Sequence, residues 1–142
     1  MHLTGAMSTD ENKRLVKRFV DEVFGQGQLE SIDELVAPDF VSHTFGITDD
    51  GRARLRAASE RVHASLTDVD FAVEDLIAEE DRVAVRLTSA ATVVDEFMGV
   101  PVAGKTYSIG EIHVFRVANG LIVEHWHQHD ALGLMKQLGA MP

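Results

Sequence analysis

The main change in the hydrophobic period of the 142-residue chain lies close to residue 69. Before that point, apolar residues recur every three or four positions, the pattern of helices that face a core. After it, apolar and polar residues alternate over long segments, which is typical of strands. The predicted helices span residues 9–25, 31–36, 50–66 and 132–138. The predicted strands span residues 40–45, 69–77, 82–94, 105–117 and 121–129, with a loop over 95–104.

Helices followed by a run of long antiparallel strands indicate an α+β fold. We expect N-terminal helices packed on a curved, mostly antiparallel β-sheet, which together form a cone with a central pocket. The length suits one domain, predicted over residues 9–142 after a flexible leader at 1–8. Thr9 or Asp10 is expected to cap the first helix, Asp49 or Asp50 the third, and Asp130 the last.

Composition excludes several classes of function. Lys and Arg number 13 against 23 Asp and Glu, a formal net charge of −10, which disfavours nucleic acid and anionic membrane surfaces as partners. There is no cysteine, so no disulfide or thiolate metal site can form. No run of 18 apolar residues predicts a membrane span, and the first residues lack the layout of a secretory signal, so we expect a cytoplasmic protein.

The turn near residue 119 sets the register of the last two strands. We favour a three-residue loop over residues 118–120, with Gly120 in a bulge. This loop pairs His113 with His125 and Glu111 with His127. A two-residue Asn119-Gly120 turn is the alternative, and it would place His113 opposite Trp126.

Alternation then divides the hairpin into two faces. The predicted inner face carries Tyr107, Ile109, Glu111, His113, Phe115, Val117, Leu121, Val123, His125, His127 and His129. The predicted outer face carries Ile112, Val114, Arg116, Ile122, Glu124, Trp126 and Gln128. The inner face combines an apolar base with titratable groups, which is how a small-molecule pocket looks.

Histidine moves protons near neutral pH, so His113 and His127 beside Glu111 are the candidate catalytic residues. Tyr107, Phe115 and His125 share their face, and His43, which follows the second helix, could reach the pocket mouth. These four are the candidate substrate-binding residues. A metal held by His125, His127 and His129, completed by Glu111 or His113, is a less favoured alternative. The glycines of the 95–104 loop lack the context of a phosphate loop, and no Gly-x-Ser-x-Gly element is present.

Several segments together resemble one known family, the SnoaL-like polyketide cyclases of the nuclear transport factor 2-like (cystatin-like) fold. They are Phe19–Phe24, Leu35–His43, Gly99–Lys105, Val117–Trp126, Asp130 and Leu132–Leu134. The resemblance runs from about residue 11 to 139. It implies a cone that is usually dimeric through the outer sheet face and uses no cofactor, and family cyclases close a polyketide ring by intramolecular aldol condensation. Carried over by position, the family's pocket histidine falls on His113 and its acid/base aspartate on His127.

The expected function is therefore cofactor-independent acid/base chemistry on a small apolar carbonyl compound, polyketide- or steroid-like. His127 would move the proton, His113 would hydrogen-bond the oxyanion and Glu111 would orient a histidine. An isomerase with Glu111 as base is a variant of this reading. The alternative is a non-catalytic ligand-binding or dimerisation module. We expect a homodimer, because Ile112, Val114, Ile122 and Trp126 would expose an apolar patch on the outer face.

Overall fold

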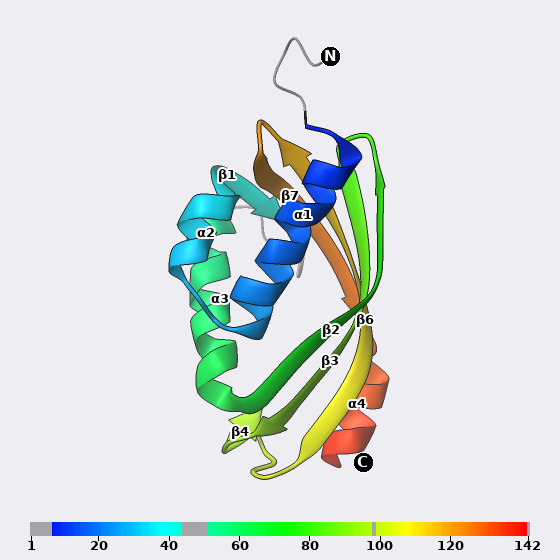
Figure 1. Ribbon diagram of the computed structural model, residues 1–142. Helices are drawn as coiled ribbons and strands as arrows, with labels where there is room; N and C mark the ends of the chain where they lie inside the picture. Colours follow the sequence, from blue (N-terminus) through cyan, green and yellow to red (C-terminus); the bar gives the residue numbers. More distant parts are fainter. Residues whose placement is uncertain (1–6, 44–50, 98, 142) are drawn as a thin grey trace.

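A five-stranded sheet carries the N-terminal helices on one side (Figure 1). The computed structural model describes residues 7–43, 51–97 and 99–141. The strand order is β1-β7-β6-β3-β2; β1 runs parallel to β7, and the other neighbours are antiparallel. The helical elements are α1 (Thr9–Phe19), η1 (Val20–Gly25), α2 (Glu30–Leu35), α3 (Gly51–Ser65) and α4 (Ala131–Leu138). The strands are β1 (Val36–Ser42), β2 (Leu66–Glu79), β3 (Arg82–Val93), β4 (Glu96–Phe97), β5 (Val100–Pro101), β6 (Thr106–Ala118) and β7 (Leu121–His129).

The helix predicted over residues 9–25 is confirmed as α1 followed directly by the π-helical segment η1. Its cap differs from the expectation. Ser8, not Thr9 or Asp10, is the N-cap: its hydroxyl accepts from the Glu11 N–H, and Glu11 accepts from the Ser8 N–H. This reciprocal pair satisfies two backbone donors that a helix start leaves unpaired. Ser8 is therefore part of the helix start, while residues 1–6 of the expected leader lie outside the described residues.

Two apolar clusters fill the space on the inner face of the sheet, the face that carries alternate buried residues of β3 and β6. The first lies under α1, η1 and α2, where Phe19 contacts Phe115 edge to face at 5.4 Å between ring centroids. The second includes Leu134 and Leu138 of α4 together with Ile109 of β6. Burial of such faces is the main favourable term in folding.

The β6–β7 hairpin does not have the predicted three-residue loop. Ala118 pairs with Leu121, so Asn119 and Gly120 form a two-residue turn, with φ of 53° and 75°. Positive φ at both positions is typical of the type I′ turn, whose twist suits a hairpin. The register then shifts between Arg116 and Val117, where a bulge on β7 inserts one extra residue.

This bulge decides which side chains are buried. Val117 pairs with Ile122, which is fully buried on the inner face, so the expectation that Ile122 lies on the outer face is wrong. Beyond the bulge, His113 pairs with His127 and Glu111 with His129, rather than with His125 and His127 as predicted. The two-residue turn alone would have turned His125 and His127 to the outer face. The extra residue returns them to the inner face, as predicted, although they pair with other residues of β6 than expected.

The turn gives a direct test of this register. We expect Gly120→Ala to lower the free energy of unfolding by about 1–2 kcal/mol, because an L side chain is strained at its φ of 75°. Gly110→Ala is the matched control: nothing lies within 4 Å of a Cβ added there, so no loss is expected. Urea unfolding of both variants measures the difference. Equal stability of the two would contradict the turn described here.

Other element boundaries differ slightly from those predicted from the sequence. The predicted loop over 95–104 contains the short β4–β5 hairpin, and β1 begins at Val36 rather than at Phe40. Asp130 caps α4 as predicted, its carboxylate accepting from the Gly133 N–H at 2.8 Å. The expected cap at Asp49 or Asp50 and the end of the predicted 40–45 strand lie outside the described residues. Among the described helices, none has the length and apolar character that crossing a membrane would require.

Candidate active site

Three histidines from neighbouring strands meet on the inner face. His113 comes from β6, and His125 and His127 come from β7, because residues two apart on a strand share a face. His113 and His125 are buried, and His127 is half-buried. One ligand nitrogen from each ring lies within 4.8 Å of the other two. The structure thus brings together three of the predicted site residues.

A chain of hydrogen bonds joins this cluster to a carboxylate. His113 Nε2 lies 2.8 Å from Glu111 Oε1, and His113 Nδ1 lies 2.8 Å from His125 Nε2. The other carboxylate oxygen of Glu111 accepts from the Ser89 hydroxyl, and His125 Nδ1 lies 3.3 Å from the Ser42 hydroxyl. Since an ionised Glu111 can only accept, His113 donates from Nε2. A neutral His113 then accepts from His125 Nε2–H, and His125 accepts from Ser42.

Aromatic rings support the histidines from below and from the side. Phe115 of the core lies 4.7 Å from His125 between ring centroids, and Phe24 of η1 lies 5.2 Å from His113. His127 lies nearly parallel to His113, with their centroids 4.8 Å apart. These contacts fix the ring orientations, as a reactive site requires.

The protein environment keeps two of these histidines neutral. Burial lowers the pKa of His125 well below its ordinary value, and the neighbouring His113 and His127 lower it further. Burial also lowers the pKa of His127 to about 4, with a further contribution from His113 that Glu111 opposes. Near pH 7, both rings are therefore uncharged.

Glu111 is the anionic member of the cluster. Burial alone would raise the pKa of Glu111, but its hydrogen bonds with His113 and Ser89 outweigh burial and hold that pKa below its usual value. An ionised carboxylate with both oxygens hydrogen-bonded therefore lies next to the imidazoles.

The remaining predicted substrate-binding residues fall in different places. Tyr107 is half-buried on the inner face beside Phe97, and burial together with Glu111 raises the pKa of Tyr107 to about 12. Its hydroxyl is therefore protonated at neutral pH. Phe115 is 1% exposed and belongs to the core, so it supports the histidines from beneath.

His43 lies away from the cluster, contrary to the expectation that it reaches the pocket mouth. Its Nε2 lies 2.6 Å from Glu124 Oε2, and its ring stacks on Trp126 at 5.1 Å between centroids. Glu124 also pairs with Arg116 at 2.8 Å, a residue predicted on the same outer face. Because β1 joins the sheet edge beside β7, the strand end carries His43 onto the outer face.

The structure changes the expected role of His113. Both of its ring nitrogens are hydrogen-bonded inside the cluster, so it has no N–H left to give to a substrate oxyanion. It instead connects Glu111 with His125.

Ser89 and Ser42 are site residues that sequence reasoning missed. Ser89 follows the alternation of β3, but its place beside Glu111 depends on the β3–β6 register, which no turn signal predicted.

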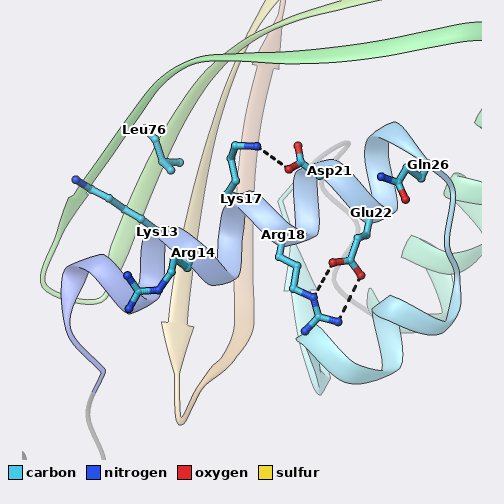
Figure 2. A pocket seen from close by; sticks show the side chains of 8 residues that line it. All are labelled: Lys13, Arg14, Lys17, Arg18, Asp21, Glu22, Gln26 and Leu76. Carbon is cyan, nitrogen blue, oxygen red and sulfur yellow. Dashed lines mark hydrogen bonds and ion pairs between the residues drawn. The ribbon is translucent and has the colours of Figure 1, made fainter.

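Two hollows on the described surface lie outside the histidine cluster. Figure 2 shows the first, between the α1–η1 helix and Leu76 of β2, where Lys17 bonds to Asp21 and Arg18 to Glu22. The second lies near Gly110 and is lined in part by Glu111 and His129. Neither is lined by His113 or His127. The central pocket expected from the sequence therefore remains a prediction.

A curved, mostly antiparallel sheet with helices on one side defines the class of protein: a nuclear transport factor 2-like α+β domain. The chain belongs to the SnoaL-like polyketide cyclase family, whose model matches residues 14–138. A comparison with curated proteins finds no match.

Solved structures agree with this assignment. TsrD from Streptomyces laurentii is 27% identical with a TM-score of 0.86, covering 95% of this chain and 99% of that one. AclR, described as a putative hydroxylase from Streptomyces galilaeus, is 31% identical with a TM-score of 0.84, covering 95% and 100%. IdmH, described as a putative polyketide cyclase from Streptomyces antibioticus, is 30% identical with a TM-score of 0.79, covering 90% and 98%.

Proposed function

We propose that this protein carries out cofactor-independent acid/base chemistry on a small apolar carbonyl compound, of the polyketide or steroid type. The observation that carries the proposal is the cluster of His113, His127 and Glu111 on the inner face, flanked by two apolar clusters. Apolar walls with a few converging polar groups are typical of small-molecule sites. The similarity to IdmH, described as a putative polyketide cyclase, supports the carbonyl class of substrate.

In the proposed reaction, a proton leaves the carbon beside a carbonyl and an enolate forms, which then attacks a second carbonyl of the same molecule. Neutral His127 takes the proton, because it is the half-buried member of the cluster. The anionic Glu111 stabilises the imidazolium that results.

Exchange of substrate protons with solvent tests this proposal. The chelator-treated chain is incubated in deuterated buffer with a panel of apolar aromatic 1,3-dicarbonyl compounds, and deuterium uptake at the carbon between the carbonyls is followed by NMR. We expect uptake faster than in buffer for at least one compound. If compounds bind and none exchanges faster, the protein is a ligand-binding module.

We also propose that the chain forms a homodimer through the outer face of the sheet. Ile112 is 53% exposed there, beside Val114 and near Trp126. Ile122 does not contribute, since it is buried on the inner face. Exposed apolar patches of this kind mark interfaces.

Ile112→Glu is expected to shift the dimer to the 15.6 kDa monomer in sedimentation velocity at micromolar concentration. The charge would be buried without a partner in the dimer and solvated in the monomer. Leu132→Glu is the matched control, because Leu132 is 55% exposed but belongs to α4 rather than to the sheet. A wild-type chain that sediments as a monomer would overturn the dimer proposal.

A further inference from the structure

We propose that His113, His125 and His127 form a binding site for a divalent first-row transition metal ion, for which Zn²⁺ is the probe. One nitrogen of each ring lies within 4.8 Å of the other two. Imidazole nitrogens suit Zn²⁺, Cu²⁺ and Ni²⁺. This site goes beyond the proposed function, whose chemistry needs no metal, and it uses His113 in place of the His129 of the ligand set considered from the sequence.

The sheet holds the three ligands near the required spacing. A tetrahedral zinc site with Zn–N bonds of about 2.0–2.1 Å separates its nitrogens by roughly 3.3 Å. His113 Nδ1 and His125 Nε2 are 2.8 Å apart, so this pair must open by roughly half an ångström. His127 is paired with His113 across the strands and must approach by side-chain rotation.

The partners that surround the cluster provide the strongest support. Histidine ligands in metal sites almost always hydrogen-bond through their second nitrogen to a carboxylate or another acceptor, which fixes the ring. Here His113 Nε2 contacts Glu111 at 2.8 Å, His125 Nδ1 contacts Ser42 at 3.3 Å, and His127 Nε2 contacts His129 at 3.2 Å. Each of the three proposed ligands thus already has such a partner.

Metal binding can occur without net loss of a proton. In the metal-free cluster the proton between His113 and His125 resides on His125 Nε2, as the hydrogen-bond chain requires. When a metal takes both nitrogens, that proton moves to His125 Nδ1, which then donates to the Ser42 oxygen. The Ser42 hydroxyl turns from donor to acceptor, which a rotating hydroxyl can do. No proton leaves the two rings in this rearrangement.

Charge and access also fit a three-histidine site. Three neutral imidazoles leave the full charge of a dication to be offset, and the Glu111 carboxylate beside His113 reduces the local charge by one. His127 is only half-buried, so solvent can reach its side of the cluster. Three protein ligands with one open position describe catalytic rather than structural zinc sites.

Direct binding tests the proposal. Chelator-treated chain is titrated with ZnCl₂ by calorimetry and with CoCl₂ by visible absorption, which reports coordination geometry. We expect one ion per chain. Because a ligand is lost, His127→Gln and His113→Gln should each weaken Zn²⁺ binding about 100-fold or more, and Glu111→Gln by about 10–100-fold as the loss of a partner to a ligand. His63→Gln, which alters an α3 histidine bonded to the Val23 carbonyl, should bind as the wild type does.

Two results would overturn the metal site: no Zn²⁺ bound by the wild-type chain, or binding that survives unchanged in His127→Gln. If circular dichroism shows that His113→Gln does not fold, Zn²⁺ binding by His127→Gln still tests the metal site, because His127 is only half-buried. The proposed function is separately tested, since its proton exchange is measured with chelator present. If the protein catalyses proton exchange but binds no metal, only the metal-site proposal is wrong. If it binds metal but catalyses no exchange with chelator present, only the proposed metal-free reaction is wrong.

Discussion

His127→Ala is expected to reduce proton exchange at the substrate carbon by about 100-fold or more, the usual contribution of a positioned general base. The half-buried ring lies on the inner face 4.8 Å from His113, and alanine leaves nothing there to receive the proton. Ligand affinity should change little, because the apolar walls are untouched. Deuterium uptake by NMR and a fluorescence binding titration, both on chelator-treated protein, measure the two effects.

His63→Gln is the matched control for this experiment and should exchange at the wild-type rate, since it lies on α3 and bonds to the Val23 carbonyl. An unchanged exchange rate in His127→Ala would mean that Glu111, not His127, is the general base, as in the isomerase variant considered from the sequence. Glu111→Gln would then lose activity while the His127 variant kept it.

Phe115→Ala is expected to lower the free energy of unfolding by about 3–5 kcal/mol, the cost of removing a large aromatic ring from a close-packed core. Phe115 is 1% exposed, contacts Phe19 at 5.4 Å and lies beneath His125. The loss should be measured by urea unfolding. Because the ring supports the cluster, exchange activity should fall together with stability.

Ile77→Ala is the matched control, because Ile77 is 64% exposed on β2 and surface changes stay within about 0.5 kcal/mol. If Phe115→Ala were as stable as wild type but bound ligand poorly, Phe115 would line the substrate site, as its face in the sequence suggested. Because Phe115 is buried in the core, we expect its replacement to lower the stability of the protein rather than to weaken ligand binding alone.

Periodicity predicted most of the elements, because burial imposes it locally. The helix over 9–25, the strand over 121–129 and the Asp130 cap are confirmed nearly residue for residue. Alternation also placed His113, His125 and His127 on one face. What it could not provide was the bulge in β7, because one extra residue in a strand leaves no compositional signal.

The sequence by itself determined the α+β class, the shared face of His125 and His127 on one strand and the absence of thiol chemistry, since each follows from residue types and their spacing along one segment. Only the tertiary structure decided which groups meet. The β3–β6 register brought Ser89 to Glu111, and the parallel β1–β7 pairing took His43 to the outer face. The hairpin register placed His125 beside Nδ1 of His113, whose Nε2 bonds to Glu111 on the same strand. The contacts of Ser89 and His43 join segments far apart in the chain, and their geometry is set by how whole elements pack, which local patterns do not encode.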